Sequence, residues 1–261
     1  MNRHASIAAL LCASLVSACG PSALQDITIA PPAASRIRFF NFGVNAPGVN
    51  FYSDATKMTA ILSSTGVEST NGIAYGGVSA NGDYLAIDPG SHTFTGKIAA
   101  TTDKDLAIAT LTTTIADGVF YSLYLSGFYN TTAKSIESFI VDDTFTIPAD
   151  VTTTSVRFVN AISNSSPMIL YAKNQTTLVE TAIGGAVAYK AAGAFTTLPP
   201  GVYDLNTRLA GSSTNLIPRT SVGLIGGRVY TITARGDITV APSTTACGST
   251  NRTCLDNTAN Y

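Results

Sequence analysis

The chain contains one short β-rich segment twice, and this duplication constrains its fold more than any other feature. Residues 36–41 have the sequence Arg-Ile-Arg-Phe-Phe-Asn, and residues 155–160 have the sequence Ser-Val-Arg-Phe-Val-Asn. Each segment leads through a turn with one proline, Pro47 or Pro167, to a second strand that ends in tyrosine. One structural unit is therefore present twice, which predicts two similar domains in succession.

Two later features also occur in both units. Residues 88–90 (Asp-Pro-Gly) and 199–201 (Pro-Pro-Gly) carry the Pro-Gly pair that a type II turn prefers. Towards the end of each unit we expect a hairpin closed by a glycine turn. Its strands are residues 107–115 and 119–126 in the first unit, and residues 220–225 and 229–234 in the second.

Short strands separated by Gly, Pro and Asn turns indicate the fold class. Thr and Val dominate where a helix would favour Ala, Leu and Glu, and about seven strands fit each unit. We therefore predict an all-β protein with two tandem immunoglobulin-like antiparallel β-sandwich domains. Its expected divisions are a signal peptide (1–18), a flexible tether (19–35), two β-sandwich repeats (36–147 and 155–240) and a C-terminal tail (241–261).

The first twenty residues predict export. A basic start precedes an apolar run from Ala5 to Ala18, which is too short to span a bilayer comfortably. The run ends in Leu-Val-Ser-Ala-Cys at residues 15–19, which resembles a bacterial lipobox. We favour lipidation of Cys19; the alternative is an ordinary signal peptide cut near Ala18 or Gly20.

The lipobox resemblance implies a bacterial outer-membrane lipoprotein. Such proteins carry several acyl chains, palmitate among them, on the first cysteine, and several chains make membrane attachment stable. Gly20 after Cys19 resembles the signal for sorting to the outer membrane, in a periplasmic or surface-facing orientation. The tether, rich in Pro and Ala, could reach about 50 Å if fully extended.

Two cysteines of the exported chain remain free to pair. Cys12 leaves with the signal peptide and Cys19 is lipidated, so Cys247 and Cys254 remain in the tail. In an oxidising compartment we expect a disulfide between them, worth about 2–3 kcal/mol in the chain-entropy model. Two thiols without a nearby histidine do not fill a zinc site, so no metal or other cofactor is expected.

Charge excludes one class of partner. The net charge is −1, only 12% of residues are charged, and Lys and Arg form no cluster. Such a chain lacks the positively charged surface patch that is typical of nucleic-acid-binding proteins. The acidic pair at residues 142–143 resembles a solvated turn more than a calcium loop.

A catalytic centre is not evident. His92 is the one histidine left after export, and Ser91 beside it points to the opposite face of a strand. A hydrolase that uses His92 with Asp88 or Asp83 stays open. We favour a packing role, because Tyr203 occupies the matching position of the second unit, and we assign no catalytic residue.

Aromatic residues offer one candidate ligand contact. Phe120 and Tyr124 lie on one strand and would form a strip for sugars or a partner chain if they were exposed. The alternative is that they pack against the neighbouring domain, which we favour because exposed apolar residues are common.

The repeated unit resembles the bacterial DUF4397 family. The resemblance rests on residues 156–160 (Val-Arg-Phe-Val-Asn), 168–171 (Met-Ile-Leu-Tyr), 198–205 (Leu-Pro-Pro-Gly-Val-Tyr-Asp-Leu) and 227–234 (Gly-Arg-Val-Tyr-Thr-Ile-Thr-Ala). It implies tandem β-sandwich modules on an exported protein and no activity. We therefore expect a non-catalytic binding or scaffolding protein of the cell envelope, with a protein or polysaccharide partner.

Overall fold

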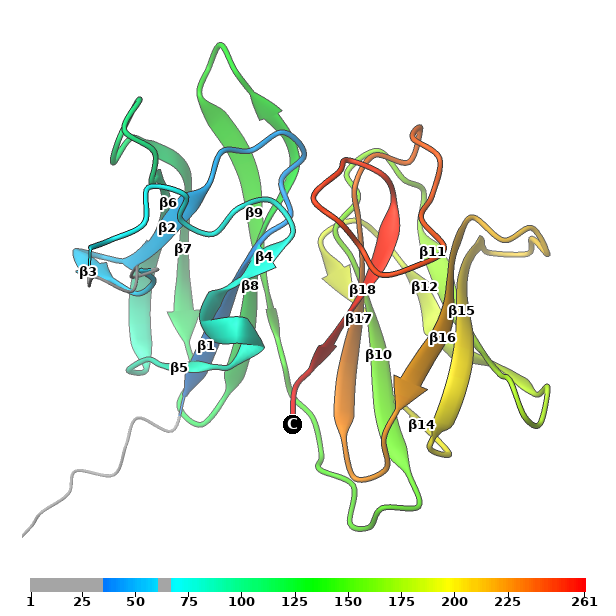
Figure 1. Cartoon of the computed structure of the whole chain (residues 1–261). Helices are drawn as coiled ribbons and strands as arrows, with labels where there is room; N and C mark the ends of the chain where they lie inside the picture. Colours follow the sequence, from blue (N-terminus) through cyan, green and yellow to red (C-terminus); the bar gives the residue numbers. More distant parts are fainter. Residues whose placement is uncertain (1–34, 61–66) are drawn as a thin grey trace, which may run out of the picture. The chain divides into compact units, whose positions relative to one another are not determined.

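The computed structural model describes residues 35–60 and 67–261, which belong to one compact unit. The signal peptide and Cys19 lie outside the described residues. The strands confirm the predicted fold class: an all-β protein built as two sandwiches (Figure 1).

The first sandwich has two sheets of unequal width. One has the order β4-β1-β8-β9, with β5 paired to β1, and the other has the order β3-β2-β6-β7. A short 3₁₀ turn, η2 (Ser79–Gly82), separates β4 from β5. The strands are β1 (Arg36–Asn41), β2 (Val49–Ser53), β3 (Thr56–Lys57), β4 (Gly77–Val78), β5 (Leu85–Ala86), β6 (Gly90–Ile98), β7 (Ala107–Ile115), β8 (Phe120–Asn130) and β9 (Ser135–Asp142).

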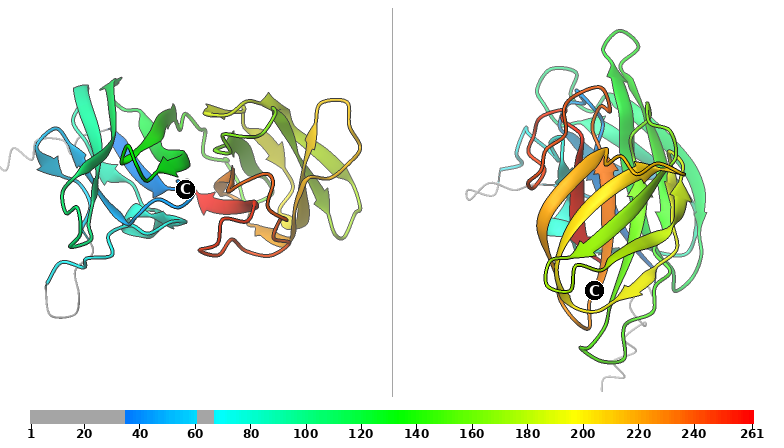
Figure 2. Two further views of the ribbon diagram at one scale, coloured as in Figure 1. Left: turned by 90° about the horizontal axis from the view of Figure 1, so that it is seen from above. Right: turned by 90° about the vertical axis from the view of Figure 1, so that its right-hand side faces the viewer.

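The second sandwich has the same arrangement. One sheet has the order β13-β10-β17-β18, with β14 paired to β10; the other has the order β12-β11-β15-β16 and faces the viewer in the right-hand view of Figure 2. The strands are β10 (Thr154–Asn160), β11 (Met168–Asn174), β12 (Glu180–Val187), β13 (Ala191–Ala192), β14 (Thr196–Leu198), β15 (Gly201–Leu209), β16 (Ile217–Leu224), β17 (Val229–Arg235) and β18 (Cys254–Ala259).

The repeated opening segments are β1 and β10, and each pairs in parallel with the last strand but one of its own sandwich, β8 or β17. Ile37 pairs with Tyr121 on β8, and Val156 pairs with Tyr230 on β17. Ile37 and Val156 occupy the same position of the repeated opening segment. All other pairings between the named strands are antiparallel.

Each sandwich buries its own apolar core. Alternation along β1 sends Ile37 and Phe39 into the first core, and alternation along β10 sends Val156 and Phe158 into the second. The opposite faces of β1 and β10 would be expected to meet water, yet they are buried as well. Phe40 on β1 belongs to a third buried cluster, which also contains residues of the second sandwich.

Two expectations about connections were wrong. The segments around Gly118 and Gly226 are not hairpins, because β7 and β8 belong to different sheets, as do β16 and β17. The glycine turns carry the chain between layers. The residues expected to form a C-terminal tail add β18 to the second sandwich, where Leu255 is fully buried in the core. β18 holds the place beside β17 that β9 holds beside β8.

Candidate functional site

A buried carboxylate joins the two sandwiches. Asp143 follows β9 and accepts hydrogen bonds from Tyr84 Oη and Ser122 Oγ, each at 2.6 Å. Its Oδ1 accepts a hydrogen bond from Arg157 Nη2 on β10, and Arg38 Nη2 on β1 lies 3.7 Å from its Oδ2. Both ion pairs are buried from solvent, so Asp143 is not the solvated turn residue that the sequence suggested.

Arg38 and Arg157 occupy the same position of the repeated opening strand. Besides Asp143, each contacts a side-chain hydroxyl, a backbone carbonyl and an aromatic ring. Arg38 donates to Ser122 Oγ (2.9 Å) and to the Ala259 carbonyl of the second sandwich (2.9 Å), and its guanidinium lies 4.4 Å from the Tyr84 ring centroid. Arg38 therefore contacts both sandwiches.

Arg157 is held similarly on the other side of Asp143. It donates to Thr231 Oγ1 (3.0 Å) and to the Asp142 carbonyl (2.7 Å), and its guanidinium lies 5.0 Å from the Phe195 ring. Burial lowers the pKa of both guanidinium groups and raises the pKa of Tyr84 to about 12. A buried charge requires a charged partner, and Asp143 provides the counter-charge for both guanidinium groups. Arg38 Nη2 is buried 3.7 Å from the carboxylate without a hydrogen-bond partner.

Tyr124, one of the two expected ligand contacts, is at this junction and not on the surface. Its side chain is fully buried and stacks on Phe40 (4.5 Å between centroids) and Phe139 (5.0 Å). The same cluster contains Val159 and Ala161 of the second sandwich. An exposed strip of Phe120 and Tyr124 is therefore excluded; the alternative, packing against the neighbouring domain, is the arrangement seen for Tyr124.

Further contacts extend the junction. Ser126 Oγ and Tyr189 Oη lie 2.9 Å apart across it. The Arg235 guanidinium on β17 lies 5.2 Å from the Phe42 ring and 4.8 Å from the Tyr75 ring of the first sandwich. Aromatic, cation–π and hydrogen-bond contacts therefore continue along the junction, and the described residues belong to one compact unit.

Phe120, the other expected ligand contact, is partly buried beside the connection between the sandwiches. Its ring touches Tyr84 (5.0 Å) and Phe145 (5.6 Å), and Phe145 lies 6.3 Å from Phe195. Phe145 and Phe195 line an open pocket of about 690 Å³, together with Asp142, Arg157 and several threonines.

His92 holds a turn together. Its Nε2 donates to the Asp88 carbonyl at 2.9 Å, and Ser53 Oγ (2.9 Å) and Asp54 Oδ2 (3.1 Å) both lie within hydrogen-bond distance of Nδ1. Tyr203 donates to the Pro199 carbonyl at 2.6 Å, in the matching turn of the second sandwich. His92 therefore has the structural role that we expected, because Tyr203 occupies the matching position of the second unit.

The His92 cluster differs from a hydrolase triad. The serine at the imidazole is Ser53 and not Ser91, and it is buried. Ser53 and Asp54 approach the same ring nitrogen, whereas a triad places the nucleophile and the acid on opposite nitrogens. Neither Asp83 nor the carboxylate of Asp88 contacts the ring.

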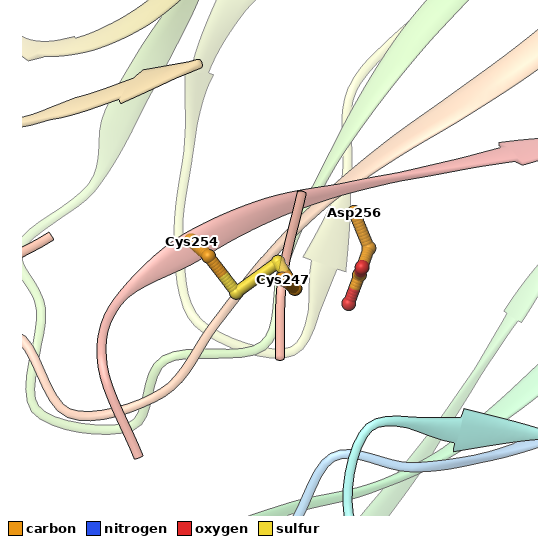
Figure 3. Close-up of side chains that lie close together, drawn as sticks. All are labelled: Cys247, Cys254 and Asp256. Carbon is orange, nitrogen blue, oxygen red and sulfur yellow. A yellow bond between two sulfur atoms is a disulfide. The ribbon is translucent and has the colours of Figure 1, made fainter. Parts of the chain in front are cut away.

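Cys247 and Cys254 form a disulfide with a Cα–Cα distance of 5.5 Å (Figure 3). The Asp256 carboxylate lies close by, and its oxygen and the two sulfurs fall within 4.8 Å of one another. Asp256 accepts a hydrogen bond from Arg235 Nε, and the sulfurs are bonded to each other. The disulfide and the Arg235–Asp256 hydrogen bond therefore both stabilise the second sandwich.

Membrane attachment through Cys19 falls outside the described residues. Within residues 35–60 and 67–261, no helix has the length and apolar character needed to cross a bilayer.

Sequence reasoning missed the buried Asp143 with its two arginines. The available signal was an arginine at the centre of each opening strand, between apolar residues, at matching positions. A charge in an otherwise apolar strand predicts a buried partner. No feature of residues 142–143 identified which acid that partner is.

No curated protein matches the chain. Three of the solved structures that are similar to this chain have TM-scores of 0.25 or less. The Bacillus anthracis TIE protein is 13% identical over 77% of this chain, which spans 33% of that protein (TM-score 0.25). A "putative cell adhesion protein" from Bacteroides ovatus is 12% identical over 88% of this chain and 96% of its own (TM-score 0.22). A second "putative cell adhesion protein", from Bacteroides eggerthii, is 7% identical over 88% of this chain and 97% of its own (TM-score 0.25).

The sequence model of one family covers about half of the chain. Its description is "Domain of unknown function (DUF4397)", and it matches residues 35–171. The match spans the first sandwich, the connection with Asp143, strand β10 and the first part of β11, so it includes both repeated opening segments. The chain belongs to the DUF4397 family.

Proposed function

We propose that this protein is a non-catalytic cell-envelope lipoprotein whose two sandwiches act as one rigid scaffold. The observation that carries this proposal is the buried Asp143, which holds an arginine from each sandwich. Partner proteins bound at different loops of such a body would keep a fixed spacing, and the lipid on Cys19 would fix the body to the outer membrane.

The matching topology supports a second copy of the family domain in residues 154–259. β10 and β17 repeat the parallel register of β1 and β8, and the sheet orders correspond strand by strand. We therefore propose two tandem DUF4397 repeats in one chain, with boundaries close to those of the two sandwiches.

Radiolabelled palmitate tests the anchor. In a bacterial host, the full chain should incorporate label and partition with membranes, and Cys19→Ala should lose the label. Cys12→Ala provides the matched control, because Cys12 lies within the signal peptide and leaves with it. Labelling of the Cys19→Ala variant, or equal loss in both variants, would contradict lipidation at Cys19.

A carbohydrate- or polymer-binding role is the second candidate. It is favoured by the pocket of about 690 Å³, where Phe145 and Phe195 supply apolar ring faces and Asp142 supplies a hydrogen-bond acceptor. A glycan array with the parent and a Phe145→Ala/Phe195→Ala variant tests it, with Phe128→Ala as control. Binding that needs both phenylalanines supports this role; no binding by the parent removes it.

A further inference from the structure

The most exposed aliphatic side chains gather at one end of the second sandwich. Among the described residues, the five most exposed large hydrophobic side chains are Val151 (73%), Val67 (66%), Leu178 (66%), Ile225 (63%) and Val179 (61%). All except Val67 lie in the connection before β10 or in the β11–β12 and β16–β17 turns of the second sandwich (Figure 1).

These loops touch one another. The Val151 backbone lies against Gly226, because a Cβ atom added to Gly226 would fall 1.7 Å from the Val151 carbonyl oxygen. Ile225 immediately precedes Gly226 in the same turn, and the residue before it, Leu224, pairs with Gly201. Val151 and Ile225 therefore belong to one surface next to the β14–β15 turn.

The surface continues to the β11–β12 turn. Val202, exposed at 43%, follows Gly201, and its carbonyl accepts a hydrogen bond from the Gln175 amide at 2.9 Å. Gln175 begins the turn that carries Leu178 and Val179. We call this surface the apolar end: Val151, Leu178, Val179, Val202 and Ile225.

The chain enters both sandwiches from the side of the apolar end. Arg38 near the start of β1 donates to Ala259, which pairs with Tyr230 near the start of β17. Phe42, just beyond β1, lies under the guanidinium of Arg235, the last residue of β17. β1 therefore runs in the direction of β17, which is parallel to β10. The starts of β1 and β10 point the same way, and the apolar end lies beside the start of β10.

We infer that the apolar end is a lipid-contacting surface whose loop tips enter the acyl-chain boundary of a bilayer. This inference rests on the proposed function, because the proposed lipid anchor places the protein at a membrane. The lipid on Cys19 would hold Ser35 within about 50 Å of the bilayer. The chain leaves the body for the lipid from the entry side, and the apolar end lies on that same side.

The chemistry of the surface favours lipid over a protein partner. Its members are all aliphatic, whereas the energetically important centres of protein interfaces are enriched in Trp, Tyr and Arg. Exposed charged residues, Asp150, Glu180 and Arg228, flank the loops and can remain among the headgroups. Because no basic cluster is present, binding should depend on apolar contact and not on anionic lipid.

Vesicle flotation tests this inference without the acyl chain. The mature chain, residues 19–261 with Cys19→Ala, is mixed with vesicles of phosphatidylethanolamine and phosphatidylglycerol at millimolar lipid. The parent should float, and a Leu178→Asp/Ile225→Asp variant should bind at least about tenfold more weakly, since two apolar side chains no longer enter the bilayer. Val67→Asp, which alters an equally exposed residue of the first sandwich, should bind like the parent.

Vesicles of phosphatidylcholine alone, and a buffer with high salt, should leave binding nearly unchanged. The inference is overturned if the parent does not float, if the double variant floats equally, or if binding requires anionic lipid. It is also overturned if sedimentation shows that the surface joins two copies of the chain and the double variant separates them. Failure of palmitate labelling would remove the anchor and leave the flotation result standing, so the two proposals fail separately.

Discussion

Arg157 on β10 pairs with Asp143, a residue that follows the last strand of the other sandwich, and both side chains are buried. Arg38 approaches the same carboxylate from β1. The repeated opening strand thus supplies a cation from each copy, and the connection between the copies supplies the anion. The two sandwiches have the same topology, and Asp143, which joins them, lies in the connection and is not part of the repeated unit.

Asp143→Asn should destabilise the protein strongly. The amide keeps the shape but leaves two buried guanidinium groups without a counter-charge, which typically costs about 3–5 kcal/mol. Urea unfolding followed by circular dichroism measures the loss. Asp142→Asn is the control: its side chain is exposed and Arg157 contacts only its carbonyl, so its free energy of unfolding should stay within about 0.5 kcal/mol of the parent value. Equal stabilities for the two variants would contradict the role of Asp143.

Stability should fall between about pH 10 and pH 12, because burial raises the pKa of Tyr84 to about 12 from its ordinary value near 10. Below pH 10 the phenol is protonated in both states, and this contribution is fully present. Between the two values the unfolded chain loses the proton while the folded chain keeps it, which removes about 2–3 kcal/mol by pH 12.

Tyr84→Phe separates this contribution from general alkaline unfolding. Its free energy of unfolding should decline less steeply than that of the parent across the same pH range. Parallel curves for the two proteins would contradict a buried, protonated Tyr84.

His92→Tyr should be tolerated, since Tyr203 forms the equivalent hydrogen bond to a carbonyl four residues earlier. His92→Ala should cost about 1 kcal/mol through the lost turn contact. Broad esterase and glycosidase screens should give equal rates for the parent and both variants. A hydrolytic rate present in the parent and lost in His92→Tyr would establish a catalytic role.

Loss of the disulfide should weaken the second sandwich modestly. Cys247 and Cys254 close a loop with a sequence separation of 7, for which the chain-entropy model gives about 2–3 kcal/mol. Chemical denaturation of a Cys247→Ser/Cys254→Ser variant measures the change, and added reductant should shift the parent curve to match it. An unchanged midpoint would show that β18 is held by its pairing with β17 alone.

Much of the fold could be predicted because the two copies inform each other. The aligned apolar positions, such as Phe39 and Phe158, face their cores. The two Pro-Gly pairs both lie at the start of a strand, β6 or β15, but the predicted type II turn is wrong for the second, because Gly201 does not have a positive φ. Connections were harder: alternation identifies a strand but not its neighbour in space, so β7–β8 resembled a hairpin. β18 was missed because Gly, Ser and Thr before it resemble a tail, while Leu255 alone gives little periodic signal.

The junction was beyond the reach of local patterns. Tyr124 and Arg38 lie on faces that a single sandwich would expose to water, and only the second sandwich buries them. Asp142 and Asp143 are identical in type, and one points to solvent while the other accepts four polar contacts. Their difference arises from tertiary structure.

Differential scanning calorimetry of the mature chain measures whether the two sandwiches unfold together through Asp143. The parent should unfold in a single transition, with equal calorimetric and van't Hoff enthalpies, and Asp143→Ala should unfold in two separate transitions. Two independent transitions in the parent would contradict joint unfolding.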